Sequence, residues 1–194
     1  MSSNHNIRLF DICREGTHVL GPGLRYVLWT QGCHRRCKGC VTPESQSLDG
    51  GTEIDIEALA TDIVDNRRID GLTVSGGEPF LQAGQLNRLL ELVHQYRPEL
   101  TVIVYTGYTL EKLEHITHAK EALQYVDVLI DGEYVEELND NKGIRGSSNQ
   151  RIIPLSHRLD KYLDQMADGI RKIEYVAQDA ATATTIGVPH KHKL

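Results

Sequence analysis

At 194 residues, the chain has the length of one domain, or of one domain with a short appendage. Hydrophobic residues make up 40% and charged residues 25%, which is ordinary for a globular protein that buries a core. The formal net charge of −6 argues against a nucleic-acid-binding protein, because a surface that follows phosphates usually shows a basic excess.

The sequence also lacks the signals of secretion and membrane insertion. Its first ten residues, MSSNHNIRLF, contain neither a basic start nor the apolar core of a signal peptide. The longest apolar runs, such as residues 126–130, are far shorter than the roughly 20 residues of a membrane span. We therefore expect a cytoplasmic protein, in which clustered cysteines are more often metal ligands or redox groups than disulfides.

Residues 1–23 are polar, carry several glycines and are expected to be irregular. The first predicted strand is residues 24–30 (LRYVLWT), which are rich in β-branched and aromatic side chains. This strand runs directly into a loop, residues 32–43, that holds three of the four cysteines. In α/β folds, loops that follow the carboxyl ends of strands carry the active site.

Strands and helices then alternate along the chain as far as Gly132. Further strands are predicted at residues 69–74, 100–105 and 126–130. Helices are predicted from 52 to 64, from Pro79 to about Arg97, at 110–115 and near Glu121. This order predicts parallel βαβ units and thus an α/β fold. We expect a partial (β/α) barrel of parallel strands, with a flat doubly wound sheet as the alternative.

The alternation ends after Gly132. Residues 133–150 are polar and are predicted to form a long loop. A short helix is predicted within residues 158–169, and residues 170–177 and 183–188 have the character of two strands that could form a hairpin. We therefore divide the chain into a core of residues 1–156 and a C-terminal extension of residues 157–194.

Cys33, Cys37 and Cys40 form a C-x3-C-x2-C motif whose thiolates can converge on one metal centre. A structural zinc site would need a fourth ligand, for which His34 and Cys13 are the nearest candidates. A disulfide is disfavoured by the expected compartment. A 4Fe–4S cluster held by three thiolates leaves one iron free for a ligand that is not protein, and it explains the odd count. The spacing favours the cluster, and Cys13 is expected to be a small buried hydrophobic residue.

Together with the cysteine motif, five other segments resemble those of a known enzyme superfamily. The C-x3-C-x2-C loop and the residues Ser75-Gly76-Gly77-Glu78-Pro79 resemble the signatures of the radical S-adenosylmethionine (SAM) superfamily. Within it, the chain resembles the activating proteins of anaerobic ribonucleotide reductase. Residues 105–108, 129–132 and 145–150 carry this second resemblance, and residues 23–25 with 28–33 resemble the entry to the cluster loop in the small activating enzymes of glycyl radical enzymes. The resemblance covers about residues 17–155. It departs at Gly39, where many members have an aromatic residue, and beyond residue 156, where those activating proteins are usually shorter.

The resemblance implies a SAM site beside the cluster. The free iron would bind the amino and carboxylate groups of SAM, with Gly76 and Gly77 allowing close backbone approach and Glu78 lying near the methionine amino group. Pro79 and Thr106 would belong to the same cofactor site. Asp131 would bind a ribose hydroxyl or the substrate, or would simply form a turn. A plain strand-to-helix turn is the alternative for the two glycines, and residues 147–150 could contact SAM or a partner or form an ordinary surface loop.

The activity implied by the resemblance is that of an anaerobic oxidoreductase. The reduced cluster donates one electron to the SAM sulfonium, and the resulting 5′-deoxyadenosyl radical abstracts hydrogen from a protein or peptide. The favoured substrate is a glycine Cα of a glycyl radical enzyme, with flavodoxin or ferredoxin as electron donor. No residue need act as an acid or base.

Two alternatives remain at this point. One is a maturase that modifies the backbone of a ribosomally synthesised peptide with the help of a separate recognition partner. The C-terminal extension motivates it, since strands there could hold an extended peptide. The other alternative is a non-catalytic zinc or iron–sulfur binding module.

Overall fold

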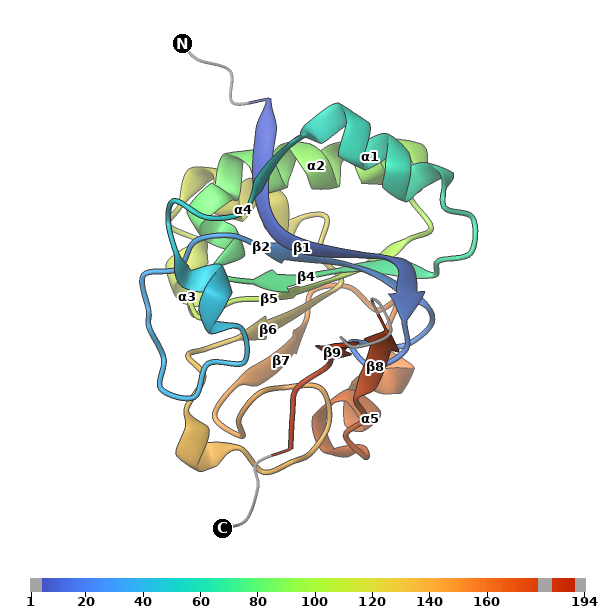
Figure 1. The fold of residues 1–194 in the computed structure, drawn as a ribbon. Coiled ribbons are helices and arrows are strands. Elements are labelled where there is room, and N and C mark those ends of the chain that lie inside the picture. The colour runs from blue at the N-terminus through green and yellow to red at the C-terminus, as the bar shows by residue number, and fades with distance from the viewer. Residues whose placement is uncertain (1–4, 178–182, 191–194) are drawn as a thin grey trace.

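The computed structural model describes residues 5–177 and 183–190, in which seven strands form one sheet in the order β3-β1-β2-β4-β5-β6-β7 (Figure 1). The central strands run parallel to one another. They are β2 (Arg25–Thr30), β4 (Gly71–Gly76), β5 (Thr101–Tyr105) and β6 (Val128–Asp131). Antiparallel strands flank them, namely β1 (Asn6–Thr17), β3 (Thr52–Asp55) and β7 (Arg151–Pro154). The expected α/β class with a parallel core is confirmed.

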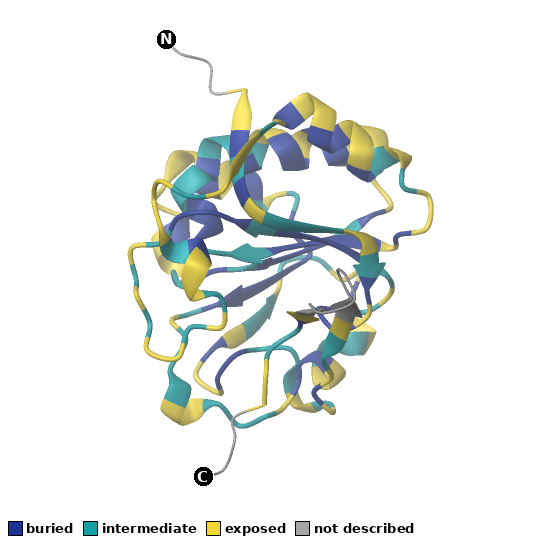
Figure 2. Cartoon of the chain, in the orientation of Figure 1, coloured by how far each residue is buried: buried dark blue, intermediate teal, exposed yellow. Residues whose placement is uncertain are grey.

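Helices cover one face of this sheet (Figure 1). They are α1 (Ile56–Asp65), α2 (Ala83–Tyr96), the short α3 (Leu110–Leu113) and α4 (Thr117–Leu123). Leu59 and Leu86 of the helices pack in one buried cluster with Leu28 and Val104 of the strands. Because strand side chains alternate, the neighbours of Leu28, Val27 and Trp29, belong to the opposite face of the sheet. Figure 2 shows the buried layer between the helices and the sheet.

Two N-terminal predictions are wrong. Residues 1–23 were expected to be irregular, but β1 is a 12-residue strand with Ile7 and Leu9 in the core. Residues 1–4 lie outside the described part of the chain. Register shifts after Leu9 and after Cys13 interrupt its pairing with β2, and such bulges break the alternation that marks a strand. Residues 52–55 were expected to start a helix, but they form β3, which pairs with β1. β7 was not predicted.

The true start of α1 has a strong N-terminal cap. The Asp55 carboxylate accepts a hydrogen bond from the Ala58 backbone N–H at 2.9 Å, which satisfies one of the free amide groups of the first turn. We expect Asp55→Ala to lower the free energy of unfolding by about 1 kcal/mol, measured by chemical denaturation. Asp55→Asn keeps a capping oxygen and serves as the control. Equal losses in both variants would contradict the capping role.

The C-terminal segment covers the face of the sheet opposite the helices (Figure 1). It contains α5 (Leu163–Asp168) and an antiparallel pair, β8 (Glu174–Ala177) and β9 (Ala183–Ile186). Met166 of α5 packs with Ile103, Val128 and Ile130 on this face. The polar stretch from 133 to 150 is mainly loop, with a 3-10 turn at Glu136–Leu138, and another such turn, Asp160–Tyr162, precedes α5.

Among the described helices, none has both the length and the apolar character needed to cross a membrane.

Candidate functional site

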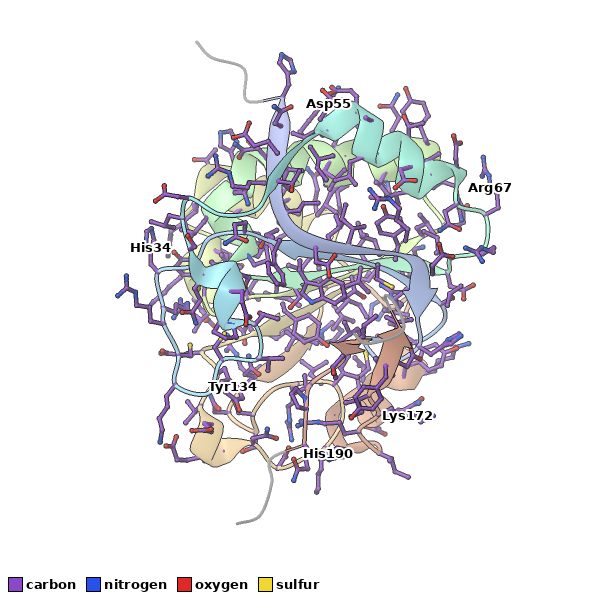
Figure 3. The ribbon with its side chains drawn as sticks, in the orientation of Figure 1. His34, Asp55, Arg67, Tyr134, Lys172 and His190 are labelled. Atoms are coloured by element: carbon purple, nitrogen blue, oxygen red, sulfur yellow. The ribbon has the colours of Figure 1, made fainter. Side chains whose placement is uncertain are left out.

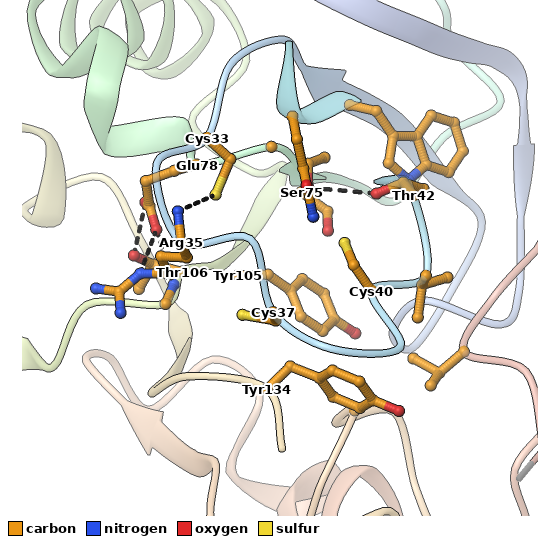
Figure 4. Close-up of a pocket in the computed structure, with 18 of the residues that line it drawn as sticks. Cys33, Arg35, Cys37, Cys40, Thr42, Ser75, Glu78, Tyr105, Thr106 and Tyr134 are labelled. Carbon is orange, nitrogen blue, oxygen red and sulfur yellow. Dashed lines mark hydrogen bonds and ion pairs between the residues drawn. The ribbon is translucent and has the colours of Figure 1, made fainter. Parts of the chain in front are cut away.

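A cavity of about 250 Å³ lies where the central parallel strands end (Figure 4). Its lining includes the thiol-bearing residues Cys33, Cys37 and Cys40 and, facing them, Gly76, Gly77 and Glu78. The structure therefore brings together two motifs that are about forty residues apart in the chain. They meet because parallel strands place all their carboxyl ends at one edge of a sheet.

The cysteine loop is fixed at both ends by backbone hydrogen bonds. The N–H of Gly32 donates to the Ser45 carbonyl at 2.7 Å, which closes the loop over the 3-10 turn Pro43–Gln46. On the other side, the N–H of Gly77 donates to Thr30 at 2.7 Å and the N–H of Glu78 donates to Gly32 at 2.8 Å. The turn after β4 thus holds the start of the cysteine loop in place.

Gly76 and Gly77 are required by this close packing. A Cβ on Gly76 would lie 2.3 Å from the Thr30 nitrogen, and the residue has a φ of +106°. A Cβ on Gly77 would lie 2.3 Å from the Gly32 carbonyl oxygen. Both contacts are far below van der Waals distance and involve backbone that cannot rotate away. The glycine pair is therefore more than a plain turn, because it lets the backbone after β4 pack directly against the backbone at the start of the cysteine loop.

The donor set of the loop suits an iron–sulfur cluster. Three cysteines of one loop line the same cavity, and soft thiolate ligands select such clusters. Burial, followed by the negative charge of Glu133, raises the pKa of Cys37 to about 11, and burial also raises the pKa of Cys33. Bound iron must therefore displace protons from these thiols. In the described part of the chain, no three His, Cys, Asp or Glu side chains are grouped as ligands for a single ion.

Neither candidate for a fourth zinc ligand lies with the three thiols. His34 lines a separate groove, with Arg8 and Gln82, and its side chain is seen at the edge of the molecule in Figure 3. Cys13 lies on β1, where it packs against the buried cluster of Val19 and Val27. Burial raises the pKa of the Cys13 thiol, as expected for a residue that only fills space.

Glu78 contributes a buried carboxylate to the cavity wall, and only 2% of its surface is exposed. It accepts hydrogen bonds from the Thr106 hydroxyl at 2.7 Å, the Gly107 N–H at 2.8 Å and the Phe80 N–H at 3.1 Å. Burial raises its pKa despite these bonds. The nearest cation is Arg35, whose Nε lies 3.8 Å from the carboxylate and is buried without a hydrogen-bond partner. A cationic group bound in the cavity would meet this carboxylate directly.

The other predicted cofactor residues divide between the cavity and its supports. Thr106 lines the cavity and orients Glu78, whereas Pro79 is buried at the start of a 3-10 turn, Pro79–Gln82. Asp131 is not among the lining residues. Its carboxylate accepts from the N–H of Leu110 at 2.8 Å and from the Arg151 guanidinium, so it caps α3 and anchors β7.

We expect Asp131→Asn to lower the free energy of unfolding by about 2 kcal/mol, because it removes the charge from buried hydrogen bonds. Glu111→Gln is the matched control, since Glu111 pairs with the same Arg151 but is exposed, and exposed pairs contribute little. Denaturation of both variants, with their iron content, checks this. Unchanged stability together with weakened cofactor binding would place Asp131 in the site instead.

The segment at 145–150 mainly stabilises its own loop. The Gln150 side chain accepts from the N–H groups of Gly146 and Ser147 and donates to the Gly132 carbonyl. Ser147 accepts from the N–H of Val135, and Asn149 donates to the Glu133 carbonyl. Gly146 and Gln150 nevertheless line the cavity.

Arg25, part of the matched segment before the cysteines, is a structural residue. Its guanidinium is fully buried and donates to the Thr73 hydroxyl at 3.1 Å and to the Leu72 and Thr101 carbonyls at 2.5 and 2.9 Å. These partners lie on β4 and β5, so Arg25 ties three parallel strands together. Burial lowers its pKa to about 10.

Sequence reasoning missed the aromatic walls of the cavity. Three aromatic residues line it: Trp29 and Tyr105, near the ends of β2 and β5, and Tyr134 of the loop after β6. Alternation within the strands could have found the first two, because their neighbours Leu28 and Val104 belong to the helix-covered face. No local signal reveals the cavity residues of the C-terminal segment, which are Thr185, Gly187, Val188 and Pro189.

Comparisons with known proteins agree with this site. Residues 19–153 match the family model of a 4Fe-4S single cluster domain. The anaerobic ribonucleoside-triphosphate reductase-activating protein of Vibrio cholerae is 38% identical over 143 residues, covering 69% of this chain and 90% of that protein. The protein of the same name from Enterobacteria phage T4 is 35% identical, and the match covers 86% of its length. That from Escherichia coli K12 is 34% identical, with 90% of its length covered, and both matches cover 69% of this chain.

Proposed function

Because this chain belongs to the family of anaerobic ribonucleoside-triphosphate reductase-activating proteins, we propose that it is a radical SAM enzyme that generates a glycyl radical on an anaerobic ribonucleotide reductase. One observation carries the proposal. The three cysteines and Glu78, which lie within the family-matched residues, line one cavity. The parallel pairing of β2, β4, β5 and β6 supports the proposal, and we infer that these strands belong to a partial (β/α) barrel.

In this proposal, each side of the cavity has a separate task. Cys33, Cys37 and Cys40 would hold the 4Fe–4S cluster, and Gly76, Gly77, Glu78 and Thr106 would surround SAM. When bound, the cluster and SAM would supply the radical chemistry: one electron from the cluster would cleave the sulfonium of SAM, and the resulting radical would take a hydrogen atom from the glycine Cα.

The chain itself binds, orients and excludes water. Glu78 presents a negative charge to the amino group of methionine, and the Thr106 hydroxyl and Gly107 N–H fix the orientation of that carboxylate. Trp29, Tyr105 and Tyr134 supply large apolar surfaces that keep water from the reacting atoms. Asp131 acts at a distance, by joining the end of β6 to the start of α3 and to β7.

The proposal is tested with protein reconstituted under anaerobic conditions. We expect bound iron, 5′-deoxyadenosine formed from SAM with reduced flavodoxin or ferredoxin, and a glycyl radical EPR signal on an anaerobic ribonucleotide reductase. Zinc in place of iron, with no SAM cleavage, would overturn the enzyme assignment. SAM cleavage without a signal on the reductase, combined with a mass change in a precursor peptide, would instead support the peptide maturase.

A further inference from the structure

The C-terminal hairpin reaches back to the cavity that holds the cysteines. Residues 19–153 account for the family match, and β8 and β9 follow that segment in the chain. Nevertheless, Thr185, Gly187, Val188 and Pro189 line the same cavity as the three thiols. This segment therefore adds a wall that the matched residues do not contain.

The wall is attached by buried and polar contacts. Ile186 is 3% exposed and packs with Val19, Leu20 and Val27 on the sheet. The Glu174 carboxylate accepts hydrogen bonds from the Thr17 hydroxyl and, at 3.3 Å, from the His18 N–H. These contacts join the end of β1 to β8 and hold the hairpin against the sheet.

A tight turn then directs the chain along the cavity. Gly187 has a φ of +108°, and a Cβ there would lie 2.9 Å from the Lys172 carbonyl oxygen. Because only glycine adopts this conformation easily, the direction of Val188 and Pro189 is set by the backbone. Val188 is half-buried, and Pro189 is exposed although it lines the cavity.

Three elements supply apolar side chains where the cavity meets solvent. Phe10 of β1 and Val41 of the cysteine loop line the cavity and are 38% and 42% exposed. Val188 and Pro189 complete this rim. The nearby Asp11 also lines the cavity, and its carboxylate accepts from the N–H of Ile12 at 2.7 Å. We call Phe10, Val41, Val188 and Pro189 the apolar rim.

We propose that the apolar rim receives the glycine-bearing segment of the protein substrate and that Val188 sets the size of residue that can reach the thiol side of the cavity. The inference rests on the proposed function, which requires a backbone Cα to come close to the cofactors. The four apolar side chains of the rim suit an extended segment with small side chains, because a large polar side chain packed against them would lose its hydration. A glycine, having no side chain, occupies the least space beside Val188.

The chain offers its own probe of this entry. Trp29 is its single tryptophan, and it lines the cavity. A tryptophan-free peptide with glycine at its centre, copied from the radical site of the reductase, should therefore change the Trp29 fluorescence on binding. The same peptide with valine in place of the glycine tests the size limit.

We expect Val188→Phe to weaken binding of the glycine peptide by about tenfold or more, and activation of the reductase to a similar extent. Iron content and the partner-independent cleavage of SAM should stay at the wild-type level. Val188→Ala should bind the valine peptide more tightly than the wild type does. Tyr175→Ala is the matched control, since Tyr175 lies on the same hairpin, is 69% exposed and does not line the cavity.

The outcomes separate the inference from the proposed function. If the Val188→Phe protein binds the glycine peptide and activates the reductase as well as the wild type does, the inference is overturned. A loss of iron or of SAM cleavage in this variant would also overturn it, because the wall would then belong to the cofactor site. If the wild-type protein fails to cleave SAM or activate the reductase, the proposed function fails. The Trp29 titration still decides whether Val188 controls peptide entry.

Discussion

Replacing Cys33, Cys37 or Cys40 by alanine is expected to reduce bound iron and 5′-deoxyadenosine formation to background. All three cysteines line the same cavity, and a cluster with only two protein ligands would be exposed to loss of iron. The remaining cysteine of the chain, Cys13, lies on β1 and does not line the cavity, so it cannot replace the missing ligand. Iron analysis, the visible absorption spectrum and product chromatography after anaerobic reconstitution measure the effect.

Cys13→Ala is the matched control for these three variants. Cys13 packs on β1 against Val19 and Val27 and does not line the cavity, so its loss should leave iron and SAM cleavage intact. Wild-type iron content in any of the three loop variants would contradict the ligand assignment. Iron loss in Cys13→Ala alone would point to a fourth thiolate ligand.

A second large effect is expected from Gly77→Ala. The new Cβ would lie 2.3 Å from the Gly32 oxygen, 2.8 Å from the Gly32 carbonyl carbon and 2.9 Å from the Ser45 oxygen. All of these are backbone atoms, so the turn after β4 and the cysteine loop must move apart. We expect the free energy of unfolding to fall by about 1–3 kcal/mol, and the protein to bind less iron. Chemical denaturation and iron analysis test both effects.

Gly84→Ala provides a control with the same change in chemistry. Gly84 lies in α2, where a Cβ would meet only the His118 ring at an ordinary 3.6 Å. Alanine there should leave stability unchanged or raise it by up to about 1 kcal/mol, because it reduces the entropy of the unfolded chain. Equal stability and iron content of Gly77→Ala and the wild type would show that the loop tolerates the displacement.

The parallel core could be predicted because its signals are local. Residues 24–30, 69–74, 100–105 and 126–130 are short apolar runs bounded by turn residues, and the corresponding strands are β2, β4, β5 and β6. The antiparallel strands could not be predicted so easily. Bulges interrupt β1. Both β3 and β7 are only four residues long and have no fully buried residue, so their pairing depends on distant partners.

The position of the candidate site could be predicted to a similar extent. Each of the two motifs, the cysteine triplet and Gly76-Gly77-Glu78, is a short run in the sequence and can be recognised locally. The structure brings the two runs to one cavity. The pairing of Asp131 with Arg151 could not be foreseen, because it depends on the antiparallel docking of β7. Likewise, Val188 approaches the thiols only through the packing of Ile186 against the sheet, which no local pattern encodes.

The contact between Thr17 and Glu174 also implies an order of assembly, since it joins residues 157 positions apart. The cysteine loop and every strand of the large sheet precede β8 in the chain. A chain made from its N-terminus can therefore form the thiol wall and the turn at Gly76 before the hairpin docks. Until then the cavity is open on the side that Val188 later occupies. We expect iron and sulfide to reach the thiols more readily during synthesis than after the last wall has closed.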